Sequence, residues 1–592
     1  MYKFLSTDSQ EQADAPKKES IHEILSDKVL PKLQEEYGKI IGGLRIETLW
    51  SPVGREKEPE ERRQIYNPRE KIQGLCDRLR RYTDEPGLYY KICKQRNDIE
   101  YLVAPDLGLG FPLHGTPEER ARQFLRFSFG LFGLSRRLFD QQIYVKHVLC
   151  SRMGTHCIFG LRYMGDEMAE TNFVVHLDND HRVVMVMNVY QPDESEYHRL
   201  LQVKLTAPQG DFVAWVSEDG EITRSYPVHA GAIPEQVKLG QVYDGFWSHL
   251  KGGKVDVDEA MLNRMGRKMV VLRGLEAKRG LVGRYAAVTD EISNYWPLQS
   301  SWFLYDPEPS SSTFDRVMAY YHIDLIQRYF RDLGVSVLDE YEQFNPVQVV
   351  LSPDRPTYYS PKEQRIHLQR LGRGEPEEEF EGGLGGEFEG GFDYKCTQAR
   401  EARVLYHEFV HVVTDALARL RRQDKGKSER FLQAAAMDEG LADYFACSLA
   451  ARHGVRRAYF GRLKLDQEAG ELEWEVERTL GPSLSKAFGY NLRPTYDANL
   501  TSEENIYKWG EQWGRYLWQL RCALGVEVAD MVIAHSIFFL TRWSTFEMGV
   551  LAIMLADRLL FEGVHESVIL NDKVKDAVGW ETCKEVMQQA AS

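Results

Sequence analysis

Two histidines and a glutamate in the segment EARVLYHEFVHVVTDALARL, residues 401–420, have the spacing of a catalytic metal site. His407 and His411 are four residues apart, so on a helix both imidazoles project from one face, one turn apart. Glu408 follows the first histidine and can reach a water held between a metal and a substrate. Two neutral imidazoles on one helix are two of the three protein ligands of an open catalytic zinc site.

The motif by itself also fits an amphipathic helix with two surface histidines, but the next helical pattern, FLQAAAMDEGLADYFACSLA, favours the metal site. Glu439 lies 28 residues after His411 and can supply an oxygen as the third ligand. Asp443, one turn later on the same face, can accept a hydrogen bond from a ligand histidine and fix its tautomer. Carboxylates on an apolar helix face are unfavourable unless they bind a cation or a partner.

The elements expected to position these residues are mostly helical. Periodic apolar residues predict helices over 400–421, 428–453, 503–524, 527–541, 544–562 and 577–590. An earlier helix begins at Ser312 or Thr313 and ends at Gly334, and His322 within it is predicted to be a packed residue rather than a ligand. Residues 345–372 are predicted to form edge strands with a turn at Pro361. The Gly- and Glu-rich loop 372–395 is either a lid that repels acidic peptides or a tolerated insertion.

The N-terminal half has the pattern of an α+β region. Thr116 opens a helix with a capping box, and alternating segments follow, with a hairpin turn at LDNDHR (177–182). Residues 198–226 predict another hairpin. Residues 1–112 contain no recognisable chemistry and are predicted to be a polar, helical lead-in.

HEFVH followed by DEGLADYFA resembles the gluzincin metallopeptidases, in particular the fungalysin and thermolysin-like group. The resemblance implies that His407, His411 and Glu439 bind one catalytic Zn²⁺, that Glu408 is the general base, and that Asp443 supports a ligand histidine. It also admits Ca²⁺, although no motif here indicates a calcium site.

The resemblance covers about residues 116 to 563. Residues 131–134 (LFGL), 173–178 (FVVHLD) and 188–190 (NVY) look like the fungalysin/thermolysin propeptide (FTP) domain, although the family often has Gln where Arg162 stands. Residues 198–226 are similar to a PepSY-type repeat. The resemblance implies that this N-terminal FTP-like domain inhibits or chaperones the catalytic part, as in a zymogen.

Two positions depart from the family pattern. The segment NIYKWGEQWGRYLW, residues 505–518, resembles a family segment in which a histidine stabilises the oxyanion, but here Tyr507 stands at that position. A tyrosine hydroxyl can donate to an oxyanion but carries no positive charge, so Tyr507 either replaces the histidine or marks a slow enzyme. Pro356 and Thr357 replace the Asn-Ala pair that holds an extended substrate, which puts that substrate clamp in doubt.

The fold class predicted from these patterns is multidomain α+β. An antiparallel-sheet, FTP/PepSY-like part precedes a thermolysin-like catalytic region with a mixed α/β half and an all-α half. The expected domains are a lead-in (1–112), an FTP/PepSY-like prodomain (113–230), the α/β part of the catalytic domain (231–400) and its helical part (401–592).

The composition of the chain argues against some classes of binding partner. The chain has 592 residues and a net charge of −15, which argues against nucleic acid and anionic membranes as partners. The family resemblance implies a peptide or protein substrate. No segment approaches the ~20 apolar residues of a membrane span. The first 20 residues lack the apolar core of a signal peptide, which predicts a cytoplasmic protein, with secretion as the family-based alternative. Eight scattered cysteines predict free thiols.

The sequence therefore predicts a zinc metalloendopeptidase that hydrolyses peptide bonds through a metal-activated water. One alternative is a zinc-binding interaction module without proteolytic activity, favoured by the departures at Tyr507 and Pro356-Thr357. Another is a zinc hydrolase that acts on a non-peptide amide.

Overall fold

The fold was analysed in a computed structural model of the 592-residue chain. It describes residues 45–50, 89–93, 98–103, 113–132, 139, 143–163, 166–188, 201–207, 210–216, 222–227, 236–242, 268–275, 281–290, 304–305, 312–336, 346–352, 355–373, 393–420, 429–455, 458–465, 472–483, 486–487, 489–493 and 495–578. The expected helix 577–590 lies almost entirely outside these residues, as do residues 374–392 of the Gly- and Glu-rich loop.

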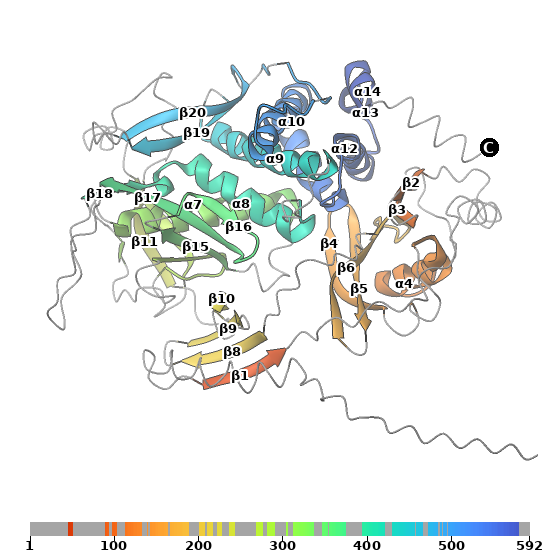
Figure 1. Ribbon diagram of the computed structural model, residues 1–592, viewed down its shortest axis with the longest axis horizontal. Helices are drawn as coiled ribbons and strands as arrows, with labels where there is room; N and C mark the ends of the chain where they lie inside the picture. The colour runs from red at the N-terminus through yellow and green to blue at the C-terminus, as the bar shows by residue number, and fades with distance from the viewer. Residues whose placement is uncertain are drawn as a thin grey trace, which may run out of the picture. The chain divides into compact units, whose positions relative to one another are not determined.

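The chain divides into two units. Unit 1 consists of residues 1–59 and 193–230, and unit 2 of residues 60–192 and 231–592. Unit 1 contains an antiparallel sheet of order β1-β8-β9-β10 (Figure 1), formed by Arg45–Trp50, Leu201–Ala207, Gly210–Val216 and Ile222–Pro227. The expected hairpin within 198–226 is present as β8, β9 and β10.

Unit 2 begins with a six-stranded antiparallel sheet of order β2-β3-β7-β6-β5-β4. Its strands are Tyr89–Cys93, Asp98–Val103, Val183–Asn188, Asp166–Leu177, Gly154–Tyr163 and Ile143–Ser151. Helix α4 (Pro117–Ser128) starts with the expected capping box at Thr116, and its Phe124 and Leu125 pack with Phe159, Phe173 and Val175 from one face of the sheet.

The opposite face of this sheet belongs to the main core of unit 2. Successive residues of a strand point to opposite faces, so Ile158 and Val174 face away from α4. They join the same hydrophobic cluster as the helices of the C-terminal half, together with Leu149, Met185 and Met187. The six-stranded sheet is therefore a middle layer between α4 and those helices.

The middle of the chain forms two further sheets. One has the order β12-β11-β14, formed by Lys268–Leu275, Gln236–Val242 and Leu304–Tyr305. The other is mixed, with the order β13-β15-β17-β16 and β18 paired to β17. Its strands are Ala286–Asp290, Val347–Ser352, Arg365–Arg373, Tyr358–Ser360 and Asp393–Thr397. Helix α7 (Ser312–Leu333) contacts β13 and ends at Gly334, as predicted. His322 is buried in α7 and bonds to Tyr406, which confirms it as a packed residue.

The C-terminal half is mainly helical. Helix α8 (Ala402–Leu417) lies beside α9 (Glu429–Arg452), which packs along α10 (Ser502–Leu524) (Figure 1). The remaining helices are α11 (Val526–Ser536), the 3-10 turn η9 (Ile537–Phe539), α12 (Phe546–Phe561), α13 (Glu566–Ile569) and α14 (Asp572–Val578).

Two secondary-structure expectations need correction. A β-hairpin, β19 (Ala458–Leu465) with β20 (Leu472–Gly481), interrupts the half that was expected to be all-α. Polar and apolar residues alternate through LEWEVERTL (472–480), which is the period of a half-buried strand, but the helical patterns on either side of this segment outweighed that signal. Residues 1–112, expected to be helical, supply strands β1, β2 and β3, since their backbone groups pair with strands much later in the chain. The segment 113–230 contributes to both units, and the expected domain boundaries stay a prediction.

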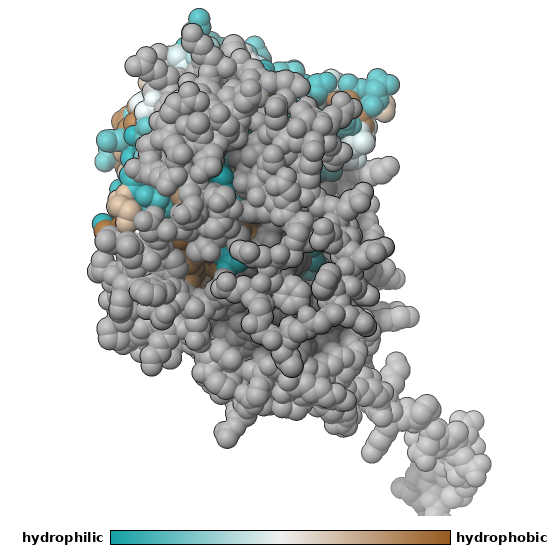
Figure 2. Space-filling view, turned by 90° about the vertical axis from the view of Figure 1, so that its left-hand side faces the viewer, coloured by the Kyte–Doolittle hydropathy of each residue, from teal (hydrophilic) through white to brown (hydrophobic). Residues whose placement is uncertain are grey.

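The surface of the described residues mixes polar and apolar side chains. On the side shown in Figure 2, hydrophilic and hydrophobic described residues are interspersed. Within the described ranges, no helix has both the length and the hydropathy needed to cross a membrane. Among the described cysteines, Cys150, Cys157, Cys447 and Cys522 are free thiols.

Candidate metal centre

Helix α8 carries the motif in the interior of unit 2. Every residue from Ala402 to Ala416 is buried, because apolar side chains surround the helix on all sides. His407, Glu408 and His411 are each about 1% exposed, so the alternative of surface histidines is wrong. Three ionisable groups buried on one core helix need partners or a cation.

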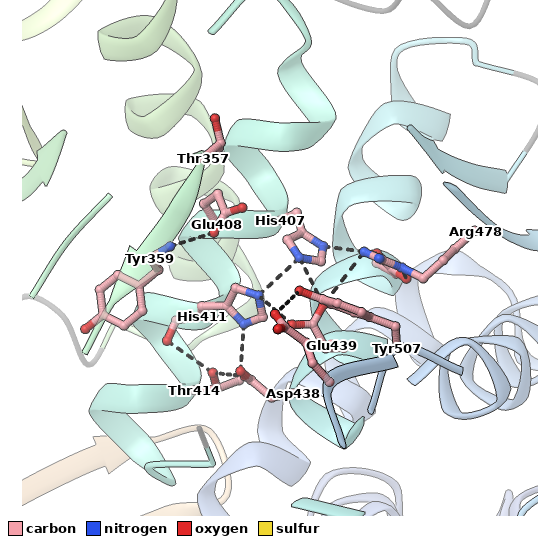
Figure 3. A network of polar contacts seen from close by, with 12 residues as sticks. Thr357, Tyr359, His407, Glu408, His411, Thr414, Asp438, Glu439, Arg478 and Tyr507 are labelled. Atoms are coloured by element: carbon pink, nitrogen blue, oxygen red, sulfur yellow. Dashed lines mark hydrogen bonds and ion pairs between the residues drawn. The ribbon is translucent and has the colours of Figure 1, made fainter. Parts of the chain in front are cut away.

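The structure brings the three predicted metal ligands together. One ligand atom from each of His407, His411 and Glu439 lies within 4.8 Å of the others. The Nε2 atoms of the histidines are 3.1 Å apart, and they lie 3.4 Å and 3.7 Å from the carboxylate oxygens of Glu439 (Figure 3). Two nitrogens and one carboxylate therefore converge on one point.

A carboxylate stands behind each histidine. Nδ1 of His407 lies 3.0 Å from Oδ1 of Asp443, and Nδ1 of His411 lies 2.7 Å from Oδ2 of Asp438. With Nδ1 protonated and facing a carboxylate, each ring presents the Nε2 lone pair to the common point. Asp438 is in turn held by the hydroxyl of Thr414, which donates to it.

Arg478, on β20, compensates part of the negative charge. It donates two hydrogen bonds to Asp443, and its Nη2 lies 3.7 Å from Glu439. Burial raises the pKa of Asp443, but the charges and hydrogen bonds of Arg478 and His407 lower it by more, so Asp443 stays ionised. Burial lowers the pKa of His407, but the hydrogen bonds to Asp443 and Glu439 raise it to about 9. The same carboxylates that favour a proton here favour a metal cation.

The donor set fits a metal ion. Two imidazole nitrogens and one carboxylate oxygen match the His₂Glu ligand set of catalytic zinc sites, which keeps a further position for water or substrate. The two histidines have their tautomers fixed from behind, as metal-ligating histidines do. His407, His411 and Glu439 can therefore hold a metal ion.

Close packing between α9 and α10 fixes Glu439. A Cβ at Gly510 would lie 2.8 Å from Cβ of Glu439, and a Cβ at Gly440 would lie 2.6 Å from the carbonyl oxygen of Gly510. Only glycine allows the two backbones to approach this closely. The glycines of α10 therefore bring its N-terminal half directly against the residue that supplies the third ligand.

Glu408 points to an edge strand. Its Oε2 accepts a hydrogen bond of 2.8 Å from the backbone N–H of Tyr359 on β16 (Figure 3), and the Tyr359 hydroxyl donates to Asp415 of the same helix α8. Among the described strands, β16 pairs with β17 alone and so ends its sheet. The backbone edge of β16 and the carboxylate of Glu408 thus face each other beside the metal ligands.

The other predicted residues lie nearby. The ring of Tyr507, on α10, lies against Arg478 with 5.2 Å between guanidinium and ring centre, and its hydroxyl donates to Glu503. Thr357 is buried; its hydroxyl accepts from the backbone of Gln369, and its carbonyl accepts from Arg462 on β19.

Sequence reasoning missed several residues that shape the centre. Asp438 precedes Glu439 directly and offered a signal, a second carboxylate on the same apolar helix. Arg478 and Phe460, which stacks on His407 with 4.5 Å between ring centres, come from the unexpected hairpin. They offered no local signal because only the tertiary fold brings β19 and β20 to the histidines.

Comparisons with known proteins find little. No family model matches the sequence, and no curated protein matches it. Among solved structures, the chain is similar to one described as "Precursor of Protealysin, Metalloproteinase from Serratia proteamaculans", with 15% sequence identity, 48% of this chain and 87% of that chain covered, and a TM-score of 0.31. A likeness at this TM-score establishes neither a shared fold nor a shared activity.

Proposed function

We propose that this protein is a zinc-dependent metallopeptidase whose metal is held by His407, His411 and Glu439. The observation that carries the proposal is the convergence of these three ligands with Glu408 next to them on the same buried helix. Zinc in such a site acts as a Lewis acid on the scissile carbonyl and lowers the pKa of a bound water to about 7.

The residues of the chain supply the remaining steps. Glu408 has a carboxylate oxygen to accept the proton of the attacking water and to deliver it to the leaving amine nitrogen. The N–H of Tyr359 holds that carboxylate in place. We propose that an extended peptide lies along the edge of β16 next to Glu408, where main-chain hydrogen bonds would orient it without strong sequence preference.

Arg478 is proposed to support the oxyanion through Tyr507. It is a buried cation that bonds to Asp443, lies next to Glu439 and touches the ring of Tyr507. Tyr507 is proposed as a donor to that oxyanion, which requires its hydroxyl to leave Glu503.

A second candidate is a zinc-binding module without proteolytic activity. Two contacts favour it: the hydroxyl of Tyr507 is engaged with Glu503, and the carbonyl of Thr357 on the substrate edge already accepts from Arg462. In either case, we propose a peptide or protein as the partner. The FTP-like N-terminal part is proposed as an inhibitor or chaperone of the catalytic part.

The deciding experiment is hydrolysis of casein by the full chain loaded with one equivalent of zinc, beside Glu408→Gln. The peptidase is expected to cleave, while Glu408→Gln keeps its zinc and loses at least about 10³-fold in rate, since the general base is gone. Equal rates for both proteins would contradict the role of Glu408. Absence of cleavage in both the full-length and the prodomain-deleted form, with zinc measured as bound, would favour the binding module; inactivity of the full-length form alone would fit an inhibited peptidase.

A further inference from the structure

A buried group of histidines lies where the six-stranded sheet of unit 2 meets the C-terminal helices, far along the chain from the metal ligands. His156 on β5 and His176 on β6 are opposite each other in the strand register, and each is about 1% exposed. Their Nδ1 atoms are 2.7 Å apart. Nε2 of His156 is 2.7 Å from the hydroxyl of Ser151.

Both rings pack directly on the helical part. His156 stacks on Phe538 of η9 with 4.2 Å between ring centres and 17° between planes. His176 lies against Phe539 at 4.9 Å. His156 and His176 lie on the same face of the sheet as Ile158 and Val174, which packs on the C-terminal core. Separating the sheet from the helices would therefore expose both histidines to water.

The turn of the β4–β5 hairpin is fixed to α7 and α11. Nη2 of Arg152 donates to the carbonyl oxygen of Asp332 at the end of α7 with a distance of 2.8 Å, and its Nη1 lies 3.7 Å from the sulfur of Met531 in α11. Asn179, in the turn between β6 and β7, donates to the carbonyl of Arg152 and joins the two hairpin turns.

The charged and titratable groups that face the pair come from every neighbouring element. His535 from α11 faces the pair, and its Nδ1–H donates to the carbonyl of Met531. Arg152 from the β4–β5 turn acts on His535, and Ser151 from β4 is neutral. All the charged forms here are positive. A distance of 2.7 Å between two Nδ1 atoms holds one proton between two neutral rings. Protonating the accepting Nδ1 breaks this hydrogen bond and makes that ring a cation, and protonating both rings places two cations side by side.

Burial accordingly lowers the pKa of all three histidines. The pKa of His176 falls to about 3 and that of His535 to about 4, and burial with repulsion from His176 and His535 brings the pKa of His156 well below its ordinary value. Once the sheet separates from the helices and exposes His156 and His176 to water, the pKa values of these two rings would return to about 6.5.

We propose that His156 and His176 form an acid-sensitive contact that holds the six-stranded sheet on the C-terminal helices at neutral pH and releases it on acidification. The closed state contains the neutral pair, and the open state binds two additional protons below pH 6.5. Protonation of each histidine then raises the equilibrium constant for opening by ~10-fold per pH unit below that value. The two histidines together raise this constant by ~50- to 100-fold between pH 6 and pH 5. The device does not depend on the proposed peptidase activity.

Hydrogen–deuterium exchange of the full chain at pH 7, 6 and 5, corrected for the intrinsic pH dependence of exchange, tests this release. Peptides covering residues 155–162 and 173–177 are expected to lose ~50- to 100-fold protection between pH 6 and pH 5. Peptides of α12, residues 546–561, serve as the internal reference and are expected to change by less than about threefold. Unchanged protection in β5 and β6, or an equal loss in α12, would overturn the proposal.

A matched pair of variants identifies the groups that titrate. The double variant His156→Gln/His176→Gln keeps polar side chains that do not titrate, and it is expected to lose the pH effect in β5 and β6. His114→Gln, at an exposed histidine next to α4, is expected to keep it. Should the double variant not fold, deuterium exchange at the imidazole C2 positions of the wild type reads the two pKa values directly: values below about 5 support the proposal, and values near 6.5 overturn it.

Discussion

Oδ2 of Asp438 lies 2.7 Å from Nδ1 of His411, and Oδ1 of Asp443 lies 3.0 Å from Nδ1 of His407. The two carboxylates flank Glu439 on one helix, so α9 supplies both the third metal ligand and the groups that orient the first two. Both aspartates are completely buried, so solvent does not weaken their interactions with the histidines.

Substituting Asp438 should weaken metal binding rather than abolish folding of the centre. Asp438→Ala frees the ring of His411 to rotate and removes the charge that makes its Nε2 a better ligand, so the affinity for zinc should fall by about 10- to 100-fold. Asp438→Asn keeps an acceptor and should lose less. Competition with a chromophoric chelator measures both. Asp572→Ala, at a carboxylate that is 98% exposed, is the control and should bind zinc like wild type.

A methyl group at Gly510 should disturb Glu439. The added Cβ would lie 2.8 Å from Cβ of Glu439, so α9 and α10 would have to separate, at about 1–3 kcal/mol in stability. Zinc affinity should decrease along with stability. Gly489→Ala meets no atom within 4 Å and should leave both quantities unchanged. Equal behaviour of the two variants would show that the helix contact does not position the ligand.

Removing Arg478 should be more harmful than removing a surface charge. Arg478→Met leaves Asp443 buried without its bidentate partner, and breaking such a pair typically costs about 3–5 kcal/mol. Urea unfolding of the zinc-loaded protein measures the loss. Lys575→Met removes an exposed pair with Asp572 and should change stability by less than about 1 kcal/mol. A similar small change for Arg478→Met would mean that Asp443 is not charged in the folded protein.

Removing the metal should lower thermal stability. A ligand that binds only the folded state contributes about 2.7 kcal/mol at 100 times its dissociation constant. A strong chelator should therefore lower the unfolding temperature of the wild type, and added zinc should restore it. His407→Ala should show a much smaller response to the chelator. An unfolding temperature that ignores the chelator in the wild type would exclude a tightly bound metal.

Glu363 should make stability depend on acid. Burial raises the pKa of Glu363, but its bonds to His367 and Arg355 lower the pKa by more, so that it falls to about 2. A depressed carboxyl pKa stabilises the fold above about 4.5, and this contribution is lost as the pH falls toward 2. Because Arg355 is 42% exposed, we expect only about 1–2 kcal/mol. Glu363→Gln should therefore be less stable than wild type at pH 7, and the difference in urea unfolding should shrink at pH 3.5.

The metal ligands could be predicted from sequence because they depend on local geometry. A spacing of four residues on a helix places two side chains on one face whatever surrounds it, so His407, Glu408 and His411 follow from the helical pattern alone. Glu439 and Asp443 were accessible in the same way, as carboxylates one turn apart on an apolar helix. The hairpin at 177–182 and the end of α7 at Gly334 also follow from local turn and capping residues.

The remainder of the site was decided by contacts between distant parts of the chain. Arg478 reaches Asp443 only because β19 and β20 form a hairpin over α9, and Tyr359 reaches Glu408 only because β16 ends its sheet beside α8. Strand pairing of β3 with β7, across more than 80 residues, likewise leaves no periodic signal in either segment. Sequence periodicity reports which face of an element is apolar, whereas the partner of that face is set by the packing of the whole chain.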